Sequence, residues 1–161
     1  NGVHMSALRL TLAPGWKTYW RAPGDGGIPP LFDWTGSGNL SGVTLSWPVP
    51  EVFYLNGMRS VGYSEVVTIP IEFRPDDDGA PIAVSGRIDI GVCEDICVPV
   101  SLVVAAELAP EGVSDPRIAA ALDDRPMTRN EAGVQEMVDR IIESVEALIA
   151  AARQRGTTAE R

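Results

Sequence analysis

The stretch "PIAVSGRIDIGVCEDICVPVSLVVAAEL", residues 81–108, decides the fold of this 161-residue chain. Two runs rich in β-branched and aliphatic residues, 81–91 and 98–108, flank a short segment that holds the only two cysteines, Cys93 and Cys97. Apolar residues that alternate with polar or small ones are typical of β-strands. The sequence therefore predicts two strands, with a turn or a short helical loop at the cysteine pair.

Further strands are predicted on both sides of breakers rich in Gly and Pro. The candidate strands are 6–12, 42–47 and 66–73, and the breakers are 21–30, 35–39, 47–51 and 74–81. Short strands with such turns and no long helix between them predict an antiparallel β-sandwich. The "DDDG" segment, 76–79, is expected to connect a hairpin, because Asp and Gly tolerate the dihedral angles of tight turns.

The composition changes after about residue 109. Residues 110–127 are predicted to be a linker with a short helix, which Ser114 caps and Pro116 begins. A longer amphipathic helix is expected from Thr128, where Glu131 completes a capping box. Its apolar stripe consists of Val134, Val138, Ile141, Val145, Leu148 and Ala152. The stripe either packs on its own domain or forms a homodimer seam. The predicted divisions are thus 1–109, 110–127 and 128–161.

Charge and hydropathy exclude several classes of function. The formal net charge of −9 and the pI of about 4.5 disfavour binding to nucleic acids and to anionic membranes. No apolar run is long enough to span a bilayer, and no signal peptide is visible. Because the chain starts "NGVHMSALRLTL" without an initiator methionine, we expect a mature chain or a fragment.

The cysteine spacing is compatible with three kinds of chemistry. A fully extended chain would hold the Cα atoms of Cys93 and Cys97 about 13 Å apart, whereas a disulfide needs roughly 4.4–6.8 Å, so the segment must bend. A loop this short stabilises a fold only slightly, which favours a redox-active pair over a structural disulfide. The acidic neighbours Glu94 and Asp95 disfavour thiolates and so suit a reductant.

Metal binding is the third alternative for the pair. His4 is the only histidine, which leaves too few ligands for an ordinary zinc site. Copper bound by His4 with Met5 and Met58 is a weak possibility, because these residues are mostly far apart in the sequence. We therefore expect no metal and no cofactor.

A set of motifs resembles a known family. In order along the chain these are "LAPGWKTYWRAPGDGGIPP", "FDW", "WPVPEVF", "GY", "VTIPIEF" and "GVCEDICVP". Together they resemble the periplasmic N-terminal domain of the DsbD/ScsB thiol:disulfide interchange proteins, over roughly residues 4–108. The resemblance implies an immunoglobulin-like sandwich that receives electrons from a transmembrane thiol domain. It also implies delivery of those electrons to periplasmic thioredoxin-fold proteins, and a link to cytochrome c biogenesis.

The resemblance also implies roles for individual residues. Cys93 and Cys97 match the redox pair, and Cys97 would form the mixed disulfide with a partner. The residues expected to cap or line the pair are Tyr19, Glu51, Val52, Phe53, Tyr54 and Tyr63, with Glu94 and Asp95 between the cysteines. Without the resemblance, Phe53 and Tyr54 could equally be core aromatics, and Glu51 a solvated acid.

The leading hypothesis is therefore a periplasmic thiol:disulfide exchange module that passes reducing equivalents through Cys93 and Cys97. A non-enzymatic, protein-binding β-sandwich with a structural disulfide is the main alternative, and a copper- or metal-handling periplasmic protein is a further one.

Overall fold

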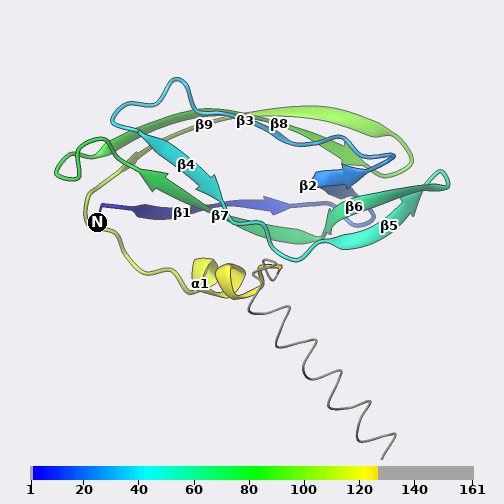
Figure 1. Cartoon of the computed structure of the whole chain (residues 1–161). Helices are drawn as coiled ribbons and strands as arrows, with labels where there is room; N and C mark the ends of the chain where they lie inside the picture. The colour runs from blue at the N-terminus through cyan, green and yellow to red at the C-terminus, as the bar shows by residue number, and fades with distance from the viewer. Residues whose placement is uncertain (1, 127–161) are drawn as a thin grey trace, which may run out of the picture. The chain divides into compact units, whose positions relative to one another are not determined.

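The computed structural model describes residues 2–126, which form nine strands and one short helix (Figure 1). The strands are β1 His4–Thr11, β2 Lys17–Gly24, β3 Leu31–Asp33, β4 Gly42–Leu45, β5 Glu51–Leu55, β6 Met58–Ser64, β7 Val66–Arg74, β8 Ile82–Cys93 and β9 Cys97–Leu108, and the helix is α1 Pro116–Asp123. The helix predicted from Thr128, with its possible dimer seam, lies outside the described residues.

The strands form two antiparallel sheets, which confirms the predicted immunoglobulin-like β-sandwich. One sheet has three strands in the order β1-β7-β4. The other sheet has six strands. Five of them follow the order β3-β8-β2-β6-β5, and the sixth, β9, pairs with β8. Strand β8 is therefore central: it pairs with β9 along its whole length, and with β3 and β2 on its other side.

The hydrophobic core lies between the sheets and draws mainly on β7 and β8. Ile71 and Phe73 of β7 meet Ile82 and Val84 of β8, and all four are buried. The ring of Trp34 packs edge-on against Phe73, with the ring centroids 5.3 Å apart. Along β8 the buried residues are the even-numbered ones from Ile82 to Ile90. Because side chains alternate along a strand, the odd-numbered residues of β8, Cys93 included, project from the opposite face of the sheet.

The "DDDG" segment does not connect a hairpin, so that prediction was wrong. It joins β7 of one sheet to β8 of the other, and these two strands do not pair. The segment is held by a side chain instead: the amide of Asn39 donates to the carbonyls of Asp77, Ala80 and Pro81. Because the segment crosses from one sheet to the other, β7 and β8 both contribute side chains to the core between the sheets.

Four strands were missed in the sequence: β2, β3, β5 and β6. The β5–β6 hairpin had a clear signal, because Asn56 and Gly57 both adopt positive φ (51° and 77°), as a two-residue hairpin turn requires. Strand β2 was harder to recognise, because its pairing with β6 is irregular between Tyr19 and Gly24.

The short helix α1 lies within the predicted linker and contacts β7 and β1. It begins at Pro116 as expected, but its cap is Asp115 and not Ser114. The carboxylate of Asp115 accepts from the backbone N–H of Arg117 at 2.8 Å and pairs with the guanidinium of the same residue at 2.6 Å. These contacts lower the pKa of Asp115 to about 2.

Among residues 2–126, no helix has the length and apolar character needed to cross a bilayer.

The position of Ile88 at the centre of β8 gives a test of the fold. Its side chain is 1% exposed, so Ile88→Ala should leave a cavity and lower the free energy of unfolding by about 2–5 kcal/mol. Val113→Ala is the matched control, because Val113 is 96% exposed. Denaturant titration of both variants measures the difference, and equal midpoints would contradict the proposed core.

Candidate functional site

The two cysteines form a disulfide at the tip of the β8–β9 hairpin. Cys93 ends β8 and Cys97 begins β9, and the two residues lie directly opposite each other in the strand register. Their Cα atoms are 4.1 Å apart. Glu94, Asp95 and Ile96 make the turn. The expected turn between two strands is confirmed.

Cys93 and Cys97 form a non-hydrogen-bonded pair of the antiparallel ladder. Such pairs have Cα atoms about 4.5 Å apart, against about 5.5 Å for hydrogen-bonded ones. The pair two residues along the ladder, Gly91 and Pro99, is also without hydrogen bonds between its two residues. The carbonyl of Gly91 accepts from the Thr18 hydroxyl on the β2 side at 2.9 Å, and Pro99 has no N–H to donate. The backbone N–H and C=O of Cys97 therefore point away from β8, towards the outer edge of β9.

The two sulfur-bearing residues differ sharply in exposure. Cys93 is 0% exposed, whereas Cys97 is exposed. Ile96, directly before Cys97, is 69% exposed, so an apolar side chain stands beside the accessible cysteine. A thiolate from outside can therefore approach Cys97 and not Cys93.

Tyr19 of β2 provides the polar contact to the disulfide. Its hydroxyl donates to Cys93 Sγ at 3.0 Å and lies 3.7 Å from Cys97 Sγ. The residue is 2% exposed, and burial raises the pKa of its phenol above the usual 10.0. The hydroxyl therefore keeps its proton at neutral pH. It can donate to the disulfide, and also to a thiolate formed from it.

Phe53 of β5 and Lys17 of β2 extend this arrangement. The ring of Phe53 stacks on Tyr19, with the centroids 6.1 Å apart and an interplanar angle of 28°. The ammonium of Lys17 lies 5.2 Å from the centroid of the Phe53 ring. Phe53 reaches Tyr19 across β6, whose intervening residues, Ser60 and Gly62, are small.

The loop after β2 covers the other side of Tyr19. A Cβ atom on Gly27 would come within 2.9 Å of the Tyr19 ring, and one on Gly91 would come within 2.8 Å of Ile28. Both glycines are therefore needed for close packing. The sequence predicts residues 21–30 as a breaker and as part of a family motif, but it predicts neither this loop nor Lys17 as part of the site. The glycines in "GDGGIPP" could have indicated that this loop packs closely against another part of the chain.

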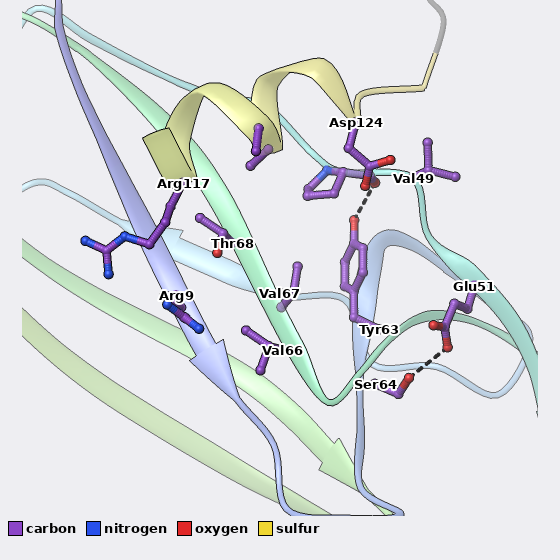
Figure 2. Close-up of a pocket in the computed structure, with 13 residues that line it drawn as sticks. Arg9, Val49, Glu51, Tyr63, Ser64, Val66, Val67, Thr68, Arg117 and Asp124 are labelled. Atoms are coloured by element: carbon purple, nitrogen blue, oxygen red, sulfur yellow. Dashed lines mark hydrogen bonds between the residues drawn. The ribbon is translucent and has the colours of Figure 1, made fainter. Parts of the chain in front are cut away.

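Glu51 and Tyr63 are not brought to the cysteine pair. Tyr63 points into the core, because it alternates with Gly62 along β6, and its hydroxyl donates to the Pro48 carbonyl at 2.9 Å. Glu51 accepts from the Ser64 hydroxyl at 2.9 Å. Figure 2 shows both residues at a pocket of about 460 Å³ that α1 lines together with β1, β6 and β7.

Val52 and Tyr54 also lie apart from the disulfide. They are 55% and 70% exposed, and they alternate with Phe53 along β5. Of the segment predicted to cap the pair, Phe53 is the member whose ring packs on Tyr19. Strand alternation separates Phe53 from Val52 and Tyr54, since neighbouring residues face opposite sides.

The acidic residues between the cysteines are exposed on the turn. The carboxylate of Glu94 lies over Gly15, where an added Cβ would be 2.7 Å from Glu94 Oε1. His4 is engaged elsewhere, with Nδ1 3.0 Å from the Ala109 carbonyl. Within residues 2–126 there is no group of three or more His, Cys, Asp or Glu side chains placed to hold a metal ion.

Taken together, the hairpin disulfide and the two antiparallel sheets define an immunoglobulin-like domain that carries a cysteine pair at the tip of a hairpin. Residues 1–107 match the family model described as "Thiol:disulfide interchange protein DsbD, N-terminal". The chain belongs to this family.

Two solved structures are similar to the chain. The N-terminal periplasmic domain of ScsB from Proteus mirabilis is 31% identical, with a TM-score of 0.65. The match covers 80% of this chain and 51% of that one, so the chain spans about half the length of that relative. The reduced N-terminal domain of DsbD from Neisseria meningitidis is 14% identical, with a TM-score of 0.42, and the match covers 63% of this chain and 74% of that one. None of the curated protein sequences matches the chain significantly.

The hydrogen bond from Tyr19 predicts a kinetic effect. When a small thiol attacks Cys97 Sγ, Cys93 leaves as a thiolate, which the phenol stabilises. Tyr19→Phe should slow reduction of the disulfide by dithiothreitol about tenfold, the effect of losing one hydrogen bond to a charged group. Tyr54→Phe removes an exposed hydroxyl and serves as the control. Equal rates for the two variants would show that the Tyr19 hydroxyl does not assist the leaving sulfur.

The packing of Phe53 on Tyr19 predicts the opposite effect. Phe53→Ala opens one side of the site and should speed reduction by dithiothreitol by up to about tenfold, as the loss of an aromatic pair allows. Tyr54→Ala is the matched control on the same strand. If Phe53→Ala leaves the rate unchanged, the ring does not shield the pair.

Proposed function

We propose that the chain is a periplasmic dithiol module that receives reducing equivalents from a membrane thiol transporter. It passes them to thioredoxin-fold partners through Cys93 and Cys97. The observation that carries the proposal is the asymmetry of the disulfide, with one cysteine exposed and the other buried against a phenol donor. A purely structural bridge has no need of an accessible sulfur beside a buried hydrogen-bond donor.

In the delivery step the pair starts as two thiols. The Cys97 thiolate attacks a disulfide of the partner, forms a mixed disulfide and releases one partner thiolate. The Cys93 thiolate then attacks Cys97 Sγ and releases the second partner thiolate. The partner gains two electrons, and the Cys93–Cys97 disulfide is formed. Protons taken up by the leaving thiolates complete the balance.

Reduction of the Cys93–Cys97 disulfide by the electron donor follows the same steps in reverse. A thiolate of the donor attacks the exposed Cys97 Sγ, and Cys93 leaves as a thiolate that accepts from the Tyr19 hydroxyl. A second donor thiolate then resolves the mixed disulfide. Two thiols return to this chain, and the donor is oxidised. Burial disfavours the charged form of a Cys93 thiolate, and the hydrogen bond from the Tyr19 hydroxyl offsets that cost.

Location and partners rest on the relatives. The ScsB relative is described as a periplasmic domain, and the family as thiol:disulfide interchange. Their likeness supports a periplasmic site of action and partners that carry their own cysteine pairs. The small exposed tip around Cys97 suits transient complexes, which bury little surface.

Single-cysteine variants test the order of attack. Cys93→Ser keeps the exposed Cys97 and should trap a stable mixed disulfide with a thioredoxin-fold protein, seen as a reducible species on a non-reducing gel. Cys97→Ser keeps only the buried thiol and is the matched control, which should trap far less. Equal trapping by both variants would contradict the assigned roles.

The reduction potential of the intact pair tests redox function itself. Structural disulfides usually have potentials below about −300 mV, so a relay should lie above that value. Equilibration with glutathione or dithiothreitol, followed by alkylation and mass spectrometry, gives the potential. A value below that range would favour the alternative of a structural disulfide.

A further inference from the structure

Lys17 of β2 lies directly opposite Cys93 of β8 in the antiparallel register. Two residues in such a pair project their side chains from the same face of the sheet, with Cβ atoms about 4.5–5.5 Å apart. Tyr19, two residues further along β2, shares this face, and its hydroxyl reaches Cys93 Sγ. The buried hydroxyl of Thr18 donates to the Gly91 carbonyl at 2.9 Å, which fixes β2 beside β8 at this point. A lysine is therefore held next to the sulfur that leaves when the disulfide is reduced.

The ammonium of Lys17 lies against the aromatic side chains that pack beside the disulfide. It is 5.2 Å from the centroid of the Phe53 ring, and that ring stacks on Tyr19. The face of an aromatic ring attracts a cation but does not neutralise its charge. Lys17 is half-buried, as expected for a residue whose apolar stem packs while its charged end remains polar in character. Within residues 2–126 none of the ion pairs includes Lys17.

The other ionisable groups around the pair are acidic or uncharged. Glu94 and Asp95 are exposed on the turn between the cysteines. Glu51 accepts from the hydroxyl of Ser64, which lies opposite Lys17 on β6. Burial raises the pKa of the Tyr19 phenol, so Tyr19 is neutral when a thiolate forms near pH 7. Of these groups, Lys17 is therefore the one that brings a positive charge to the buried sulfur.

We propose that Lys17 assists the exchange reaction by placing its ammonium where it stabilises the Cys93 thiolate. This inference rests on the proposed exchange function and names a further residue that the reaction uses. When a donor thiolate attacks Cys97 Sγ, a new S–S bond forms, the Cys93–Cys97 bond breaks, and the electron pair leaves with Cys93 Sγ. Cys93 is 0% exposed, and an opposite charge has its largest effect on a group that water does not reach.

The size of the effect follows from the register. A lysine stem spans about 5 Å, so the pairing keeps the ammonium within about 10 Å of the Cys93 sulfur. At an effective dielectric constant of about 20, two unit charges that far apart change an ionisation equilibrium about tenfold. Because both groups are at least half-buried, salt should screen this interaction only weakly.

The first test titrates Cys93 in the full chain with Cys97→Ser, where Cys93 is the single thiol. Thiolate is followed by its ultraviolet absorbance, and a chain that lacks both cysteines corrects for the tyrosines. Lys17→Met keeps an apolar stem and removes the charge, so the titration midpoint should move to higher pH by about one unit. Lys17→Arg keeps the charge and its contact with a ring, and should keep the midpoint. An unchanged midpoint in Lys17→Met overturns the inference, and so does a Cys93 thiol that stays protonated until the parent chain unfolds in alkali.

Arg21 supplies a matched control on the same strand. Its guanidinium lies over the Trp20 ring, 4.8 Å from the centroid, so it is also a cation held on an aromatic side chain. It is four residues beyond Lys17, where β2 no longer pairs with β8. Arg21→Met makes the same change in net charge and should leave the midpoint of Cys93 in place. Equal shifts in Lys17→Met and Arg21→Met would indicate a general effect of net charge and would overturn the inference.

The second test measures the reduction potential of the intact pair against pH. Lys17 stabilises the reduced state only when Cys93 is ionised, so parent and Lys17→Met should agree well below the titration midpoint. As the pH rises through the midpoint, their equilibrium constants with glutathione should diverge to about tenfold, or about 30 mV, with the disulfide of Lys17→Met the harder to reduce. Loss of packing alone would give a difference that is the same at every pH, and that result overturns the inference.

The same measurements separate failure of this inference from failure of the exchange function. If the parent disulfide has a potential in the range of structural disulfides, the exchange function fails and the role of Lys17 fails with it. If the parent potential is that of a relay, but Lys17→Met changes neither the titration of Cys93 nor the pH dependence of the potential, only the role of Lys17 fails.

Discussion

The direct opposition of Cys93 and Cys97 in the β8–β9 ladder is the constraint on which the site depends. A non-hydrogen-bonded pair brings two Cα atoms closest together in an antiparallel sheet, and here they are 4.1 Å apart. The same geometry turns the backbone groups of Cys97 outward. One feature of strand pairing thus permits the disulfide and also directs the backbone groups of Cys97 towards the outer edge of β9.

The side chains around the disulfide form a thin layer outside the sandwich core. Even-numbered residues of β8 fill the core, so Cys93 faces the other way and needs separate cover. Tyr19 supplies that cover, and Phe53 and the loop near Gly27 pack on Tyr19 in turn. The layer buries one sulfur and leaves its partner open. An attacking thiolate therefore meets Cys97, and the displaced sulfur is held beside a phenol that keeps its proton.

The pocket beside α1 is separate from this chemistry. Its lining includes Glu51 and Tyr63, whose polar atoms bond to Ser64 and Pro48 and not to the cysteines. The family match ends at residue 107, before α1 begins. The family model therefore matches the two sheets and the hairpin. The helix adds contacts with β1 and β7, away from the disulfide.

Sequence patterns alone predicted the fold class and the hairpin with its turn at the cysteines, because strand alternation and turn residues are recognised over a few positions. The family was predicted from the resemblance of several motifs along the chain. The sequence did not determine that "DDDG" crosses between sheets, because strand pairing is a long-range choice. Residue spacing also could not reveal that Asp115, one position after the expected Ser114, caps α1.

Which residues meet at the disulfide depends on tertiary packing. Tyr19 and Cys93 are far apart in the sequence, and Phe53 reaches Tyr19 because small side chains on β6 leave space. The same alternation turns Tyr63 into the core and leaves Tyr54 exposed. The unequal burial of the two cysteines likewise depends on β2, which pairs with β8 at Cys93, whereas Cys97 lies on the outer strand β9. The order of residue types along the chain does not show which cysteine is buried, because burial depends on which distant segments fold over the pair.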